Sequence, residues 1–209
     1  KALNIDDEEA FVQHILERIN WERDLHFYTK TSIDTLDYSG EGLNTGSKVV
    51  IAAAGNKCRI LARTFTSANS KPEGITNIKV VAPGVLAVSC TAFGTYEKAS
   101  AEMEVWANSL KEYLGEQANS LPLLLLCDDA DFVAKTYSNF LWSTFTRANP
   151  SHDIYGIDSF TKHKHWGCKG YLMIDTRIKP HHAPPLILDE EVEKKVDELF
   201  ANHSELSKL

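Results

Sequence analysis

Long apolar runs and paired cysteines are both missing from this 209-residue sequence. The apolar segment LPLLLLC at 121–127 is far shorter than the roughly 20 residues that a membrane-spanning helix needs. The four cysteines are widely spaced and form no CxxC pair, so we expect free thiols and no disulfide framework. With no signal-peptide pattern either, these absences indicate a cytoplasmic protein.

Positive charge is also scarce. The chain has 22 lysines and arginines against 29 aspartates and glutamates, a formal net charge of −7, which argues against non-specific binding to DNA or to an anionic membrane. It also lacks a glycine-rich nucleotide loop, a Ser-His-Asp set and a Cys-His dyad. The opening KALNIDDEEAF has no initiator methionine, so we expect the chain to be part of a longer protein.

The first third of the chain reads as an N-terminal extension, residues 1–70. Apolar residues at helical spacing predict a helix over 7–19. Two β-like runs follow at 48–55 and 58–64, and the short gap between them predicts a hairpin. The polar, turn-rich stretch TSANSKPEG comes next, which favours a domain boundary near residue 70.

Residues 71–209 alternate between strand-like and helical patterns. Strands are predicted at 77–90, 121–127, 152–157 and 171–177, and helices at 95–114, 131–146 and 190–202. This alternation predicts an α/β domain with a layered, mostly parallel sheet and flanking helices. In the last helix, one apolar face is expected to point inward, formed by Val192, Val196, Leu199 and Phe200.

The polar segment SFTKHKHWGCKG at 159–170 is the first candidate site. His163, His165 and Cys168 are ligand types that zinc prefers, but HxHxxC is not a common structural spacing and no second cysteine pair exists. The alternative is an anion site, because the segment also supplies lysines and an indole.

Three further polar groups have both a functional and a structural interpretation. Asp128 and Asp129 follow a predicted buried strand, where they could hold a hydrated cation or begin the next helix. His181 and His182 precede two prolines, which favours a surface or interface arm over a proton-transfer role. The third group is a basic cluster that suits a carboxylate or phosphate unless it is only a solvated face: Lys162, Lys164, Lys169, Arg177 and Lys179.

The segment at 123–160 resembles the carboxyl-terminal part of UbiD-type decarboxylases, which are related to 3-octaprenyl-4-hydroxybenzoate carboxy-lyase. These proteins show an apolar strand, a DDD-like acidic turn, a helix with LWALATR and then P..D. The counterparts are Cys127–Asp131, Leu141–Arg147, Pro150 and Asp153. GCKGYLMIDTRIKP at 167–180 is similar to the family's GxxxGIDATxKxP segment, although MIDTR departs from it, and EEVEKKVDELF matches the closing helix.

This resemblance implies a non-oxidative, reversible decarboxylation of an aromatic or unsaturated acid such as polyprenyl-4-hydroxybenzoate. The family cofactor is prenylated FMN, held with manganese or magnesium and a monovalent cation. The family's catalytic Glu-Arg-Glu set lies in an earlier flavin-binding domain that has no counterpart in this sequence, so we expect no catalytic residue in this chain. The implied partners are that missing domain and further copies of the chain, as a homodimer or larger homo-oligomer.

The resemblance also assigns roles to individual residues. Arg147 and, less directly, Lys98 correspond to cofactor-facing positions. Phe160, His163 and His165 correspond to the segment that lines the substrate cavity. The alternative is a non-catalytic assembly protein of the same family, which would keep the contacts between protomers without the chemistry.

Overall fold

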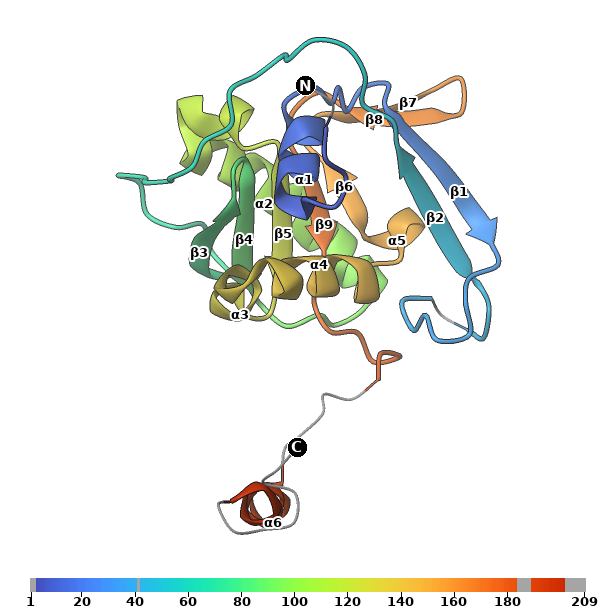
Figure 1. The fold of residues 1–209 in the computed structure, drawn as a ribbon. Helices are drawn as coiled ribbons and strands as arrows, with labels where there is room; N and C mark the ends of the chain where they lie inside the picture. The colour runs from blue at the N-terminus through green and yellow to red at the C-terminus, as the bar shows by residue number, and fades with distance from the viewer. Residues whose placement is uncertain (1–2, 41, 184–188, 202–209) are drawn as a thin grey trace.

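The computed structural model describes residues 3–40, 42–183 and 189–201, and a five-stranded sheet lies at its centre (Figure 1). In spatial order, the strands are β3 (Ile75–Ala82), β4 (Val85–Cys90), β5 (Leu123–Cys127), β9 (Leu172–Asp175) and β6 (Ile154–Gly156). The β4–β5 and β5–β9 pairs are parallel, whereas the β3–β4 and β6–β9 pairs at the two edges are antiparallel. The predicted α/β class is therefore confirmed, with a mixed sheet in place of a mostly parallel one.

The two antiparallel edge pairs are connected in different ways. Between β3 and β4 the chain reverses at Pro83 and Gly84, and Gly84 adopts a φ of 79°, which glycine reaches without strain. At the other edge, the predicted strand at 152–157 begins as one helical turn, α5 (Pro150–Asp153), and only its second half forms β6. The β3–β4 reversal therefore takes two residues, whereas the chain returns from β6 to β9 over residues 157–171, and a helical crossover joins the parallel strands β4 and β5.

Helices cover both faces of the sheet, as Figure 1 shows with α1 and α4 in front of it and α2 behind. β5 is buried along its whole length, which explains its uninterrupted apolar sequence. Behind the sheet lies α2 (Tyr96–Leu114), whose buried residues include Met103, Trp106 and Leu110, and a 3₁₀ turn, η1 (Gly115–Ser120), follows it. In front lie α1 (Glu8–Leu16), α3 (Ala130–Lys135) and α4 (Tyr137–Thr146).

The helix predicted over 131–146 is divided in two at Thr136. This residue has extended backbone angles, φ −143° and ψ 154°, and its hydroxyl accepts a hydrogen bond from the Asn139 N–H at 3.1 Å. A threonine that caps a helix in this way ends the continuity of the helix before it. The break therefore follows from the capping preference, which the apolar periodicity of the segment conceals.

The hairpin predicted from 48–55 and 58–64 is wrong. β2 (Gly46–Ile51) pairs instead with β1 (Leu25–Thr31), and residues 58–64 form no strand. The backbone N–H groups of Cys58 and Arg59 instead donate to the Glu17 carbonyl. Apolar residues of the N-terminal segment also enter the core in front of the sheet, and the Trp21 indole donates to the Pro122 carbonyl at 3.0 Å. The boundary near residue 70 stays a prediction.

The last helix, α6 (Glu190–Phe200), forms where it was predicted and begins at Asp189, whose carboxylate accepts from two backbone N–H groups. Its apolar face does not point inward as predicted, because Val192, Val196, Leu199 and Phe200 are each about half exposed, from 44% to 56%. The helical spacing identified the face correctly but carried no information about what it contacts. None of the helices in the described ranges combines the length and apolar character that crossing a membrane requires.

The four cysteines are all free thiols. Cys58 is exposed, whereas Cys90, Cys127 and Cys168 are buried. Burial raises the pKa of all three buried thiols, to about 12 for Cys127 and Cys168. The thiolate that reacts with electrophiles is therefore disfavoured at these three positions.

Candidate functional site

The polar segment 159–170 forms a hairpin of β7 (Ser159–Lys162) and β8 (His165–Cys168). Its two-residue turn consists of His163 and Lys164, with φ values of 51° and 66°. Left-handed angles at both positions define the hairpin turn that Asn-Gly normally fills. A histidine and a lysine here place imidazole and ammonium groups at an exposed tip, at some cost in backbone strain.

The hairpin lies on the N-terminal segment. A side chain at Gly167 would come within 3.0 Å of the Trp21 and Glu22 backbone, so only glycine permits this approach. The Cys168 N–H donates to the Trp21 carbonyl at 3.2 Å, and His165 Nε2 lies 2.9 Å from the Glu22 carbonyl oxygen. The ring of Trp166 meets that of Phe27 edge-on at 5.5 Å. Residues far apart in the sequence are thereby held in one place.

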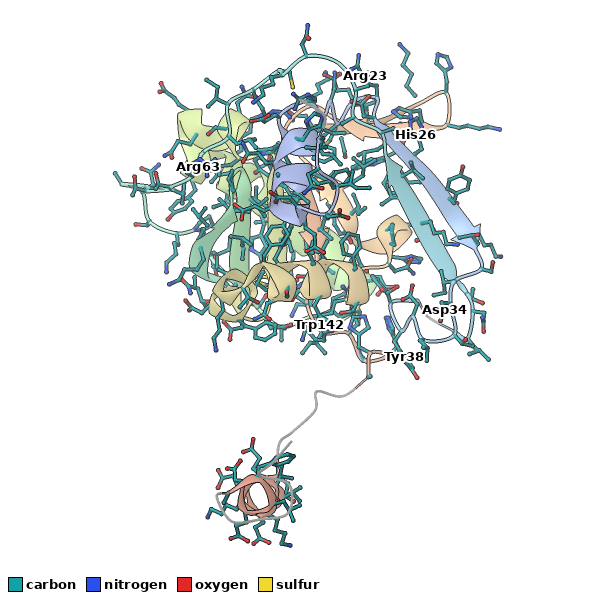
Figure 2. All side chains as sticks on the ribbon, viewed as in Figure 1. Arg23, His26, Asp34, Tyr38, Arg63 and Trp142 are labelled. Atoms are coloured by element: carbon teal, nitrogen blue, oxygen red, sulfur yellow. The ribbon has the colours of Figure 1, made fainter. Side chains whose placement is uncertain are left out.

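A cleft of about 630 Å³ opens between β1 and this hairpin. His26 on β1 faces the hairpin with its ring 6.0 Å from that of His165, and Figure 2 shows it near the start of β1 beside β8. None of the lining residues is acidic, and they include His26, Tyr28, Ser151, His163, Lys164, His165 and Trp166. The predicted pair His163 and His165 thus shares one cleft, whereas Phe160 is not among the lining residues.

The zinc interpretation is not supported by the geometry. Cys168 Sγ lies in the core, 3.8 Å from the Tyr171 carbonyl oxygen, whereas His165 is bonded to Glu22. Among the described residues, no three histidine, cysteine or acidic side chains converge in a way that could hold a metal ion. The HxHxxC spacing places its residues on a strand and a turn whose side chains point to different surroundings.

The predicted basic cluster divides into two groups with opposite environments. Lys162, Lys164 and Lys169 are exposed. Arg177 and Lys179 are instead almost completely buried, at 0% and 1% exposure, which contradicts a continuous basic surface. A charge at that depth needs carboxylate partners, and both have them.

Arg177 is bound on two sides. Its Nε and Nη2 donate to the two carboxylate oxygens of Asp175 at 2.9 and 2.8 Å, and Nη1 donates to Glu102 at 2.8 Å. The guanidinium also lies 5.3 Å from the Trp106 ring and 5.5 Å from the Phe93 ring. Burial alone would lower the pKa of Arg177, but the bonds to Asp175 and Glu102 raise it above its ordinary value.

Lys179 connects the end of β9 to the helices in front of the sheet. Its Nζ donates to the Asp175 carbonyl at 2.6 Å and to the Arg147 carbonyl at 3.0 Å. Nζ also lies 3.1 Å from Asp153 Oδ1, although that oxygen has no partner with hydrogen-bond geometry. Burial raises the pKa of Asp153 to about 6, although the Lys179 charge and the Asn149 N–H act to lower it.

The remaining predicted residues surround this buried network at the carboxyl end of the sheet. Asp129 caps α3, as the helix-start interpretation expected, and Asp128 accepts from the Ile178 N–H at 2.8 Å. Arg147 lies 3.8 Å from Asp128 and stacks 4.6 Å from the Trp142 ring centre, and burial lowers its pKa despite the nearby carboxylate. Lys98 Nζ is largely exposed and lies 3.8 Å from Glu102, which joins Lys98 to the network through Arg177.

His181 and His182 are half-buried beside the network, with ring centres 4.7 Å apart. The Lys179 N–H donates to His182 Nδ1 at 3.2 Å. Burial, together with the Lys179 charge, lowers the pKa of His182 to about 4, so this ring is neutral at pH 7. The predicted arm beyond residue 183 lies outside the described residues.

The partners of the buried cations were missed by the sequence analysis. Asp175 lies within the strand predicted at 171–177, two and four residues before Arg177 and Lys179, and this spacing was a usable signal for local pairing. Glu102 and Asp153 lie 75 and 26 residues from the cations they meet, and only the fold brings them there.

The sequence of this chain matches that of known proteins. Residues 1–53 match the sequence profile of the 3-octaprenyl-4-hydroxybenzoate carboxy-lyase C-terminal domain. The resemblance to UbiD-type decarboxylases is therefore confirmed, and residues 1–53 carry the signature of that family's C-terminal domain. The match lies in the segment predicted to be an extension, whereas the motifs that suggested the family lie at 121–200.

Relatives align along nearly the whole chain. An uncharacterized protein of Chlamydia caviae is 30% identical over 93% of this chain and 31% of its own length. A protein of Chlamydia pneumoniae, named as one of the subunits of a 4-hydroxybenzoate decarboxylase, is 29% identical over 95% of this chain and 33% of its own length. The chain thus spans about a third of these relatives. An open form of Sedimentibacter hydroxybenzoicus vanillic acid decarboxylase is 15% identical, with a TM-score of 0.34, over 62% of this chain and 30% of its own.

Proposed function

We propose that this chain is the C-terminal part of a carboxy-lyase that removes CO2 non-oxidatively from an aromatic or unsaturated carboxylic acid. The alignment of 95% of the chain with a protein named as part of a 4-hydroxybenzoate decarboxylase carries this proposal. Polyprenyl-4-hydroxybenzoate, an acid of the same chemical class, is the substrate the resemblance suggests. Because about two thirds of each relative lies outside the aligned part, the activity belongs to a longer protein and not to these residues alone.

Prenylated FMN is the cofactor implied by this family, with manganese or magnesium and a monovalent cation. The guanidinium of Arg147 fits the anionic phosphate of such a group, because its 3.8 Å contact with Asp128 is longer than a hydrogen bond and leaves it loosely held. Lys98 is exposed enough to add a second positive charge. When bound, the cofactor supplies the electron sink for decarboxylation, and the protein orients the acid and excludes water. The resemblance implies that the main metal ligands belong to the flavin-binding part, and no group of three possible ligands gathers among the described residues.

Substrate contact is proposed for the cleft beside β1. His163, Lys164 and His165 offer cationic or polar donors suited to a carboxylate, and Tyr28 and Trp166 offer ring faces. A cleft volume of about 630 Å³ is ample for an aromatic acid. In this role the chain closes one side of a pocket whose other side belongs to the flavin-binding part.

The same chain is proposed to mediate assembly into a homodimer or larger homo-oligomer. Half-exposed Val192, Val196 and Phe200 on α6 support this part of the proposal, since such apolar faces usually mark contact surfaces. Light scattering at tens of micromolar is expected to report a dimer or larger species. A monomer across that range would remove the assembly role.

The decisive experiment uses the longer protein from which this chain derives. Its upstream sequence is expected to encode the Glu-Arg-Glu set, and the protein loaded with prenylated FMN is expected to release CO2 from 4-hydroxybenzoate or a prenylated derivative. The 209-residue chain alone serves as the matched control and is expected to release none. A longer protein without the Glu-Arg-Glu set would favour the alternative, a non-catalytic assembly protein.

A further inference from the structure

The hydrogen bond between His165 and the Glu22 carbonyl fixes where one hydrogen of the imidazole lies. A carbonyl oxygen can only accept, so at 2.9 Å His165 Nε2 must carry the donated hydrogen. In the neutral ring, the other nitrogen, Nδ1, is then a lone-pair acceptor. His165 can donate a second hydrogen bond only after it gains a proton.

The cleft around this ring has an uneven charge composition. Its lining contains three histidines and one lysine but no acidic residue, in a chain whose formal charge is −7. His26 approaches from β1, with its ring 6.0 Å from His165 and tilted by 57°. The two imidazoles therefore line one cleft from two different strands, close enough for a small anion to contact both.

Every charged or titratable group among the residues that line the cleft is cationic or neutral, and the Glu22 side chain does not line it. From β1 come His26 and Tyr28, from the turn His163 and Lys164, and from the paired strand Lys162, which lies opposite His165 in the ladder. No carboxylate within the cleft competes with a ligand for a protonated imidazole. An incoming anion would be the first negative charge that the cleft contains.

The geometry points to a proton-coupled anion site, in which the cleft binds the carboxylate of a small planar acid between His165 and His26 and takes up a proton as it does so. This inference rests on the proposed function for the choice of an acid as ligand, and it adds His26 and the coupling to protons. Tyr28, which strand alternation places on the same face of β1 as His26, would contact the planar body of the ligand. The close backbone approach at Gly167 holds the hairpin against Trp21 and Glu22, the segment that leads into β1.

Calorimetric titration of the 209-residue chain with 4-hydroxybenzoate tests this inference without any cofactor. Binding at pH 7 is expected to take up a fraction of a proton, measured by repeating the titration in buffers of different ionisation enthalpy. The affinity is expected to fall at least about fivefold from pH 6 to pH 8, the range in which imidazoles titrate. The neutral analogue 4-hydroxybenzamide is expected to bind more weakly and without proton uptake.

Two variants assign the effect to residues. In His165→Gln the amide can still donate to the Glu22 carbonyl but cannot gain a proton, so the pH dependence of the affinity is expected to be weaker than in the unaltered chain, in which His26 and His163 are also present. His26→Gln is expected to lower the affinity about tenfold, a loss of one charge-assisted hydrogen bond. His14→Gln, in α1 and outside the cleft, is the matched control and is expected to behave like the unaltered chain.

Several outcomes would overturn the inference: no binding at millimolar acid, binding without proton uptake, or inorganic phosphate binding as tightly as 4-hydroxybenzoate. Because these titrations involve no catalysis, their result is separable from that of the proposed function. If the longer protein fails to release CO2, the proposed function is contradicted, but the binding measured in the cleft remains valid. Conversely, if the longer protein is an active decarboxylase but its His26→Gln variant binds 4-hydroxybenzoate normally, only the proposed anion site would be wrong.

Discussion

The hairpin cleft and the buried network at the carboxyl end of the sheet hold positive charge in opposite ways. In the cleft, His163 and Lys164 lie in solvent on a strained turn, with no acidic side chain among the lining residues. In the network, Arg177 and Lys179 are buried and each contacts carboxylates within about a hydrogen-bond length. The first arrangement leaves charge available for a ligand, whereas the second uses charge to join distant parts of the fold.

The largest contrast is expected in stability. Lys179→Met would leave Asp153 buried without a cation, whereas Asp175 keeps Arg177, so we expect a loss of about 3–5 kcal/mol in the free energy of unfolding. Lys169→Met, the matched change on an exposed lysine, is expected to stay within about 0.5 kcal/mol. Urea denaturation of both variants measures the difference. Equal losses would mean that burial does not separate the two groups of cations.

The buried network is also expected to make stability depend on pH, through Asp153. Its pKa is raised to about 6 in the folded protein against an ordinary 3.8, so between about pH 4 and pH 6 the unfolded chain releases this proton first. This residue therefore lowers the free energy of unfolding as the pH rises through that window, on the order of 2–3 kcal/mol in total.

The test compares the unaltered chain with Asp153→Asn in urea at half-unit steps from pH 4 to pH 7. The difference in free energy of unfolding, unaltered minus variant, is expected to fall with rising pH and to level off above about pH 6. The subtraction removes the contributions of the other carboxylates. A flat difference would show that Lys179 keeps Asp153 ionised throughout.

In the cleft, function is expected to respond more than stability. His163→Ala in the longer enzyme is expected to raise the activation free energy by about 1–3 kcal/mol, because the carboxylate loses its orientation. This lowers the specificity constant by about one to two decades. Its exposed position limits the change in the free energy of unfolding to about 0.5 kcal/mol. Kinetics and thermal midpoints on the same variant separate these effects, and unchanged kinetics would reduce the turn to a solvated surface.

The smallest expected effect is a gain in stability from a substitution in the hairpin turn. Lys164 has a φ of 66°, so Lys164→Gly is expected to raise the free energy of unfolding by up to about 1 kcal/mol by relieving left-handed strain. The turn offers its own control, Lys164→Asn, which tolerates that conformation and is expected to give a smaller gain. A loss of stability in both variants would show that the lysine side chain contributes contacts worth more than the strain.

The sequence predicted the elements that local pattern determines. β5 was recognisable because it is buried on both faces, and α2 because its apolar residues recur at helical spacing after the cap Thr95. The failed hairpin at 48–64 shows the limit. β2 finds its partner β1 across a loop, and nothing in the apolar pattern of either strand specifies the other.

The candidate site was predicted as a set of residue types and not as an arrangement. The density of histidine and lysine at 159–170 identified one side of the hairpin cleft. His26 could not be predicted, because its neighbour in space, His165, lies about 140 residues later in the sequence. Arg177 and Lys179 were grouped with Lys162, Lys164 and Lys169 as one basic cluster, because the five residues lie close together in the sequence. Their environment is decided by strand β9, which carries them into the core beside Asp175.

The distribution of the thiols provides a way to time the opening of these regions. In a modification experiment with a thiol reagent, Cys58 is expected to react at once, because it alone is exposed. Cys168 on β8 and Cys127 on β5 can react only when their surroundings open. If the hairpin detaches from β1 without disturbing the sheet, Cys168 will be modified faster than Cys127. Equal rates would mean that the cleft and the sheet open in a single event, so that the cleft is as rigid as the core on which it is built.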